Sequence, residues 1–165
     1  MWIYPHLLEQ MHRAPDLVIR LTAAPQVSVV ASVLTGDIDL GVVAEKANHP
    51  RLHATPLIHE EICLIVPTKF ASDTLDFQRL DELDFVAHPD GFTYADNLFS
   101  LNFPDDFKGV DHPKIRTSIN QIGQIPIPAA QGLGYTILPK SGVEAFPNQQ
   151  NISIVQLLER KYHAL

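Results

Sequence analysis

The chain is predicted to be an α/β protein of two Rossmann-like lobes, each with a central mixed, mainly parallel sheet. Three observations favour this class. Strand-length apolar runs alternate with helical apolar stripes along the chain, and the connections between them are short. Hydrophobic residues make up 45% of the 165 residues, which is enough to bury a core. Helices that cover both faces of a sheet are the usual outcome of such alternation.

The first lobe is expected to cover residues 1–66. Apolar residues recur at helical spacing from Ile3 to Met11 and again from Val27 to Leu34. Gly36 follows the second stripe, where a glycine commonly ends a helix. Runs of β-branched and aliphatic residues predict three strands, at residues 16–22, 37–43 and 61–67.

The second lobe is expected to cover residues 67–155, and residues 156–165 should begin the return to the first lobe. Pro126 and Pro128 lie within one predicted helix, which should therefore be kinked or partly irregular, because each proline removes a helical hydrogen bond. The expected elements are strand 83–87, helix 94–102, strand 114–118, helix 120–131, strand 135–139, helix 141–146 and strand 152–157.

Composition and charge argue against several classes of protein. The net charge of −7, from 12 basic and 19 acidic residues, has the wrong sign for gripping a phosphate backbone, so this segment alone should not bind DNA. The single cysteine, Cys63, excludes an internal disulfide and is expected to be a buried strand residue. The longest apolar runs are strand-sized, far below the roughly 18 residues of a membrane span. With no secretory signal in residues 1–10, a cytoplasmic location is expected.

The sequence has no GxxxxGK[ST], GxSxG, HExxH or GxGxxG motif, so neither an enzyme nor a cofactor is expected. His49 and His53 lie four residues apart near His59, which raises a metal cluster as an alternative. The helix that would align the first pair cannot continue through His49-Pro50. A solvated loop without metal is the favoured interpretation.

Two strand-to-helix junctions offer hydrogen bonds to a ligand. At the first, Ala23 and Ala24 leave room, while Thr22 and Gln26 supply polar groups. Free N–H groups and the dipole of the helix start favour an anion there.

The second junction carries Thr117, Ser118 and Asn120, at the end of strand 114–118. These side chains suit helix capping as well as they suit ligand binding, so both interpretations remain open.

His88 and Pro89 form a third candidate. They follow the strand 83–87 and precede a turn, and in α/β folds ligand crevices open at the carboxyl ends of strands. A turn histidine without a ligand is the alternative.

Several phrases together resemble the effector-binding domain of LysR-type transcription regulators, which has the type 2 periplasmic-binding-protein fold. The phrases occur in the order and at the spacing of that family across nearly the whole chain. Each phrase taken alone is explained mainly by a structural role. They are Tyr4-Pro5, Ala14-Pro15-Asp16, the Gly36–Gly41 phrase GDIDLG, Pro56-Leu57, the Glu61–Pro67 strand and the Ala130–Pro139 phrase AQGLGYTILP.

This sequence also departs from the family pattern. The family normally begins with a DNA-binding winged helix-turn-helix, a linker helix and a first strand, and none of these precedes Ile3. The last helix of the first lobe is also missing after Leu165, so the first lobe is expected to be incomplete. Pro126 and Pro128 replace a commonly apolar helix.

The resemblance implies a ligand-sensing and dimerisation domain. A small-molecule effector, with an organic acid as the expected class, would lie between the lobes and contact residues 22–26 on one side and His88, Ser118 and Asn120 on the other. The assembly would be a homodimer or tetramer that meets promoter DNA only through the absent N-terminal domain, with no membrane partner. The main alternative is a periplasmic solute-binding protein of a transporter, and a small-substrate enzyme on the same scaffold is a third.

Overall fold

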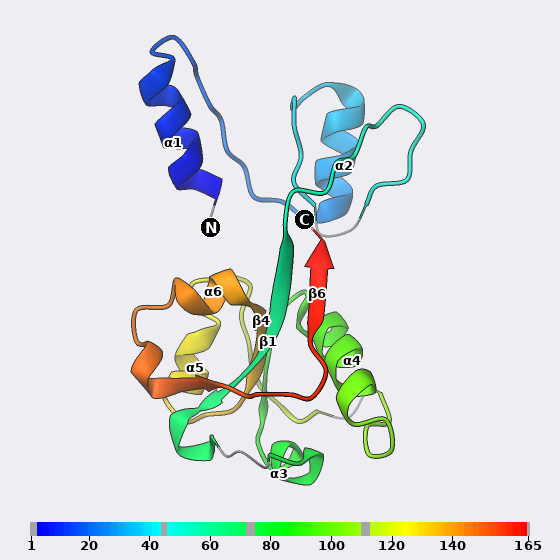
Figure 1. The fold of residues 1–165 in the computed structure, drawn as a ribbon, viewed down its shortest axis with the longest axis vertical. Coiled ribbons are helices and arrows are strands. Elements are labelled where there is room, and N and C mark those ends of the chain that lie inside the picture. Colours follow the sequence, from blue (N-terminus) through cyan, green and yellow to red (C-terminus); the bar gives the residue numbers. More distant parts are fainter. Residues whose placement is uncertain (1–2, 44–45, 72–74, 110–112, 165) are drawn as a thin grey trace. The chain divides into compact units, whose positions relative to one another are not determined.

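The computed structural model describes residues 3–43, 46–71, 75–109 and 113–164. The chain divides into two compact units, Met1–Glu60 with His163–Leu165, and Glu61–Tyr162 (Figure 1). The lobe limits expected from the sequence, 1–66 and 67–155, stay a prediction.

The first unit contains two of the predicted helices. Helix α1 spans Ile3–Arg13 and helix α2 spans Gln26–Thr35. Gly36 ends α2 in the left-handed conformation, with φ of 82°, and its N–H donates to the carbonyl of Val33 at 3.2 Å. The prediction that Gly36 terminates this helix is therefore confirmed.

The strands predicted at 16–22 and 37–43 are wrong, because both segments are irregular in the structure. The N–H groups of Asp37 and Ile38 donate to the Ser32 carbonyl at the end of α2, so helix termination uses groups that a strand would need. Val18 and Leu40 are 78% and 89% exposed, so neither segment has the buried face that holds a strand in register.

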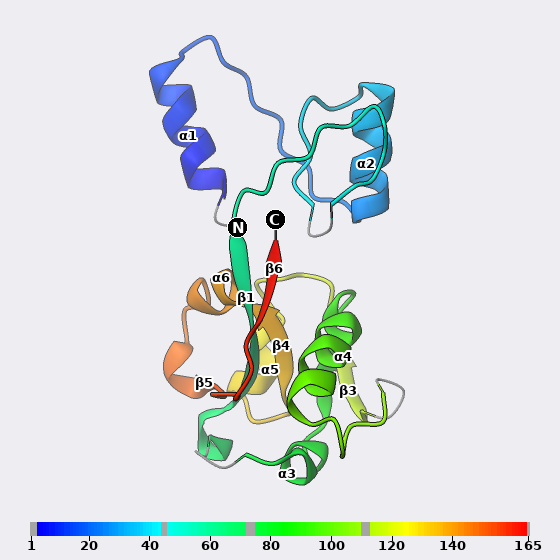
Figure 2. The same cartoon turned by 45° about the vertical axis from the view of Figure 1, so that its right-hand side comes forward.

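The second unit alternates strands and helices in the predicted order (Figure 2). Short helix α3 was not anticipated, and the strand predicted over 152–157 is shorter than expected. Two 3-10 turns lie at Thr68–Phe70 and Gln149–Asn151. The elements are β1 His59–Pro67, α3 Phe77–Asp81, β2 Phe85–Ala87, α4 Gly91–Asn102, β3 Ile115–Ser118, α5 Pro126–Ala130, β4 Thr136–Pro139, α6 Lys140–Glu144, β5 Ile152–Ile154 and β6 Lys161–Ala164.

The predicted helix 120–131 is shorter than expected. Residues 122–125 form turns, and α5 begins only at Pro126. A proline lacks the N–H that a helix interior needs, but the first turn tolerates it because those N–H groups have no helical partner. The two prolines therefore move the start of the helix rather than kink its middle.

Parallel and antiparallel pairing both occur, as predicted, but the sheets are not mainly parallel among the described strands, because two of the three described ladders are antiparallel. Strand β1 pairs antiparallel with β4 and β5 and also pairs with β6, whereas β2 pairs parallel with β3. A parallel bridge between Phe85 and Tyr135 places the chain entering β4 beside β2. The antiparallel pairings therefore all involve the long strand β1.

Side chains of β1 alternate between two hydrophobic clusters, one on each face of the sheet. Ile62 and Leu64 join a cluster with residues of α4, and Cys63 and Ile65 join one with residues of α5 and α6. The prediction that Cys63 is a buried strand residue is confirmed, since it is 4% exposed. This gives the second unit a three-layer α/β core.

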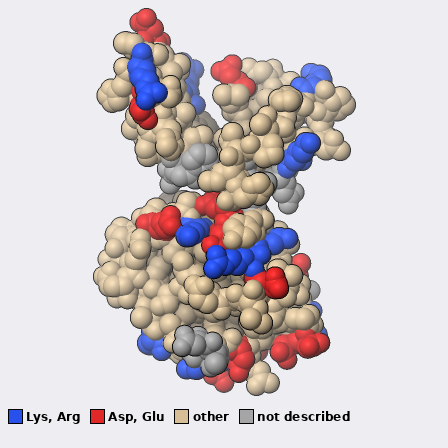
Figure 3. All heavy atoms as spheres, in the orientation of Figure 1, with Lys and Arg blue, Asp and Glu red and all other residues tan. Residues whose placement is uncertain are grey.

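The surface carries both signs of charge. In Figure 3, basic and acidic side chains lie next to one another on the visible face of the second unit, and no broad basic area is seen there. Glu61 illustrates the pattern, with Arg160 at 3.5 Å and Lys140 at 4.0 Å. Among the described residues, no helix has the length and apolar character needed to cross a membrane.

Candidate functional site

The carboxyl ends of three parallel strands meet at one edge of the second unit. Ala87 of β2 pairs with Ser118 of β3, and the Ile119 N–H donates to the Ala87 carbonyl at 2.9 Å. On the other side of β2, the Val86 N–H donates to the Tyr135 carbonyl at 2.8 Å, which aligns β4. We call the residues at these ends, 88–91, 117–120 and 139–141, the strand-end edge.

Three of the predicted site residues lie on the β3 part of the strand-end edge. Ser118 and Asn120 are exposed and Thr117 is half-buried. Within the described part of the chain, the side-chain polar groups of these three residues have no hydrogen-bond partner. The interpretation of Ser118 or Asn120 as a helix cap is wrong, because the next helix begins at Pro126. Their polar groups are therefore open to a ligand or to water.

His88 is a buried residue of the strand-end edge. It is 4% exposed, and its Nε2 is 2.7 Å from the Ile137 carbonyl. A carbonyl oxygen only accepts, so the neutral ring must carry its proton on Nε2. The ring packs under the start of α4, where a Cβ added at Gly91 would lie 2.9 Å from the His88 Cδ2. His88 thus positions the edge, while Pro89, which follows it, is exposed.

Burial lowers the pKa of His88 below its ordinary value of 6.5, against smaller raising effects of the Ile137 carbonyl and Asp90. The unfolded chain therefore binds a proton more readily than the folded one. The contribution of neutral His88 to stability should be complete above pH 6.5 and should decline as the pH falls below it. We expect His88→Gln to have a smaller loss of unfolding free energy between pH 7.5 and pH 5.5 than the unmodified chain, measured by urea denaturation.

The control for this pH experiment is His59→Gln, at an exposed histidine of β1. This variant should keep the pH dependence of the unmodified chain. Equal losses for His88→Gln and the unmodified chain would contradict the assignment of a buried, neutral His88.

The remaining predicted site residues lie in the first unit, at the start of α2. Thr22, Ala23 and Ala24 are exposed, and Gln26 is half-buried. Pro25 occupies the N-cap position, so no side chain caps this helix. The Thr22 hydroxyl has no hydrogen-bond partner among the described residues. An uncapped helix start beside small residues has the donors that an anionic group needs.

Sequence reasoning missed two parts of the strand-end edge. Helix α4 begins at Gly91, three residues before the predicted start, and Asp90 at its N-cap makes no side-chain capping bond. Lys140 follows β4 directly, and its ammonium group lies 4.0 Å from the Glu61 carboxylate. Two features of the sequence could have indicated these parts. They are the turn residues Pro89-Asp90-Gly91 before α4 and the Pro139-Lys140 dipeptide at the end of β4.

A ligand-binding α/β domain is the class that this fold and its strand ends define. The model of the LysR substrate binding domain family matches residues 1–164, and the chain belongs to that family. The family is one of transcription regulators, which is not a class of enzymes. This family match gives no support to the alternative of a periplasmic solute-binding protein.

The chain is similar to the HTH-type transcriptional regulator BbuR of Bordetella bronchiseptica, with 29% identity over 147 residues. That match covers 84% of this chain but 43% of BbuR, so the chain spans less than half the length of this relative.

Two solved structures share the fold. The CcmR regulatory domain of Synechocystis PCC6803 in complex with 2-PG has a TM-score of 0.75 at 17% identity, covering 99% of this chain and 81% of that one. The effector binding domain of QuiR in complex with shikimate has a TM-score of 0.64 at 16% identity, covering 97% and 78%. At these identities the likeness concerns the fold alone.

Proposed function

We propose that this chain is the effector-sensing part of a LysR-type transcription regulator. The observation that carries the proposal is the family match over residues 1–164. Two features of the described residues agree with it. Polar groups without partners lie at the ends of parallel strands in the second unit, and an uncapped helix start lies in the first.

In this proposal, the effector contacts residues 22–26 and the strand-end edge. Thr22, Ser118 and Asn120 supply hydrogen bonds, and the N–H groups at the start of α2 face the ligand. A small organic acid is the proposed class, because helix starts favour negative charge. His88 acts as a support for Pro89 and the first turn of α4 rather than as a contact.

The proposed effector acts by shifting a conformational equilibrium in the cytoplasm. It must bind one arrangement of the two lobes more tightly than the other, because equal affinity for both arrangements would shift nothing. The proposed readout is the geometry of a homodimer or tetramer, which would reposition DNA-binding domains at a promoter. DNA contact belongs to an N-terminal domain outside this chain.

A thermal-shift screen of organic acids tests this proposal, because a ligand that binds only the folded state raises the melting temperature. We expect Thr22→Val and Ser118→Ala each to weaken a stabilising acid by about tenfold, since each removes one hydrogen bond worth about 1 kcal/mol or slightly more.

Matched controls come from exposed residues elsewhere in the same units. Thr55→Val and Ser100→Ala should leave the affinity of the acid unchanged. The site assignment would be wrong if Thr22→Val and Ser118→Ala behaved like these two controls.

A further inference from the structure

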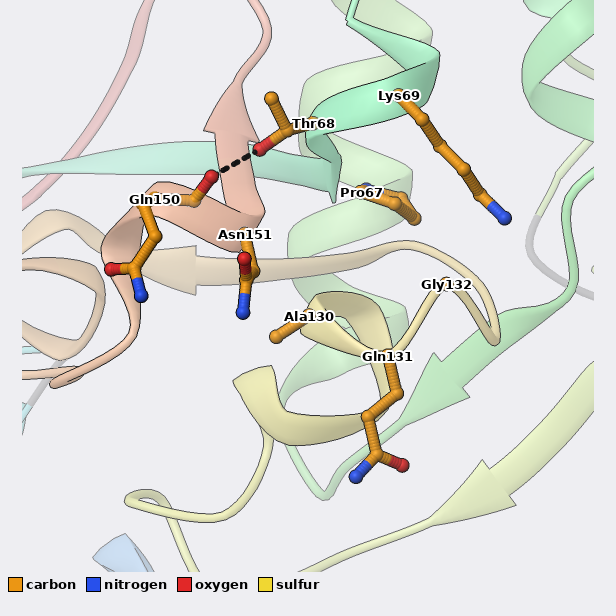
Figure 4. A pocket seen from close by; sticks show the side chains of 8 residues that line it. All are labelled: Pro67, Thr68, Lys69, Ala130, Gln131, Gly132, Gln150 and Asn151. Carbon is orange, nitrogen blue, oxygen red and sulfur yellow. Dashed lines mark hydrogen bonds between the residues drawn. The ribbon is translucent and has the colours of Figure 1, made fainter.

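A cavity of about 220 Å³ lies at the edge of the second unit opposite the strand-end edge. Strand β1 runs antiparallel to β4, so the end of β1 lies at the edge where β4 begins. The cavity is bordered by Pro67, Thr68, Lys69, Ala130, Gln131, Gly132, Gln150 and Asn151 (Figure 4). All eight residues belong to the second unit, so the cavity is independent of the site proposed above.

Hydrogen bonds hold two walls of this cavity together. The Thr68 hydroxyl donates to the Gln150 carbonyl at 3.0 Å, across 82 positions of sequence. Ser153 Oγ lies 3.4 Å from the same hydroxyl. Pro67 pairs with Ile152 in the ladder between β1 and β5. The cavity is therefore formed by fixed parts of the fold.

The charge of the lining is positive. Lys69 is its cation, and none of the eight lining residues is acidic. Among the described residues, Lys69 makes no ion pair, and its Nζ lies 5.1 Å from the centre of the Phe70 ring. Gly132 leaves space for this side chain, because an added Cβ would lie 3.0 Å from the Lys69 Nζ. The exposed Lys69 side chain thus brings an ammonium group without a carboxylate partner to the border of the cavity.

The remaining surfaces indicate what kind of anion fits. Pro67 and Ala130 offer apolar surface, and the Asn151 amide has no hydrogen-bond partner among the described residues. In Figure 4, Gln131 and Gln150 extend away from the space between these residues. A cavity of 150 Å³ holds a molecule as large as benzene, so this volume admits an organic group of similar size.

We propose that this cavity is a second small-molecule site, which binds a small organic carboxylate. The carboxylate meets the Lys69 ammonium, and the apolar body of the ligand rests on Pro67 and Ala130. The site lies apart from the strand-end edge, so a ligand there acts in addition to the proposed effector.

The test is a titration of the ¹⁵N-labelled 165-residue chain with butyrate, followed by amide chemical shifts. Saturable shifts are expected at Lys69, Gly132 and Asn151. Lys69→Met, which keeps the length and removes the charge, should weaken binding by about tenfold, the loss of one charge-assisted hydrogen bond. Lys108→Met, at an exposed lysine of the same unit, should bind like the unmodified chain.

Two further probes define the ligand class. Butyramide has the same body without the charge and should give no saturable shifts at these amides. Inorganic phosphate has the charge without the body and should bind more weakly than butyrate. The proposal is overturned if butyrate gives no saturable shifts at these amides, if Lys69→Met binds it unchanged, or if phosphate or butyramide binds as well as butyrate. Thr22→Val and Ser118→Ala should leave butyrate binding unchanged, which separates this test from that of the effector site.

Discussion

Replacing Gly134 by alanine is expected to lower the free energy of unfolding by about 3 kcal/mol or more. Gly134 has φ of 151°, and an added Cβ would lie 2.1 Å from the carbonyl oxygen of Asp84. That carbonyl accepts the Tyr135 N–H at 2.9 Å, which holds the start of β4 beside β2. The methyl group would clash with backbone, which cannot move aside as a flexible side chain can. The strands that form the strand-end edge would therefore separate or the chain would distort.

Urea denaturation followed by circular dichroism measures this effect. Gly123→Ala is the matched control, because an added Cβ there meets nothing within 4 Å and no positive φ is required. The control should change stability by less than about 1 kcal/mol in either direction. Similar free energies of unfolding for the two variants would contradict the close contact between Gly134 and the Asp84 carbonyl.

Replacing Phe85 by alanine is expected to cost about 3–5 kcal/mol. Phe85 is fully buried in the middle of the sheet, and its ring lies 5.5 Å from Phe92 and 5.2 Å from Tyr135, measured between ring centres. The substitution leaves a cavity between β2, the first turns of α4 and the residue before β4. Because total stability of a domain is only about 5–15 kcal/mol, this variant should be mostly unfolded at modest urea concentrations.

The matched control is Ile115→Ala, at the residue that pairs with Phe85 in the neighbouring strand. Ile115 is 53% exposed, so the loss there should stay below about 1 kcal/mol. Urea unfolding followed by circular dichroism gives both values. A cost for Phe85→Ala as small as that for Ile115→Ala would contradict the core described here.

The second unit was largely predictable from sequence because its apolar runs are buried on both faces. Strand β1 is an example, since Cys63 and Leu64 enter different clusters and the run reads as continuously hydrophobic. Predictions for the first unit were poorer. Val18 and Leu40 look like strand residues, but a strand forms only with a neighbour, and their segments lack one among the described residues.

The site was predictable in part. Strand ends can be read from sequence, so Ser118 was placed correctly at an edge. The burial of His88 could not be read in the same way, because it depends on the Ile137 carbonyl, 49 positions away. The cavity at Lys69 could not be predicted from the sequence either, because its walls come from three segments that only the folded sheet brings together.

The central proposal is that one small molecule contacts both the start of α2 and the strand-end edge. Amide chemical shifts of the labelled chain, recorded with an acid that raises its melting temperature, test this claim most directly. We expect shifts in both segments, residues 22–26 and 117–120, with the same binding constant. Shifts restricted to only one of these segments, or found only around Lys69, would contradict it.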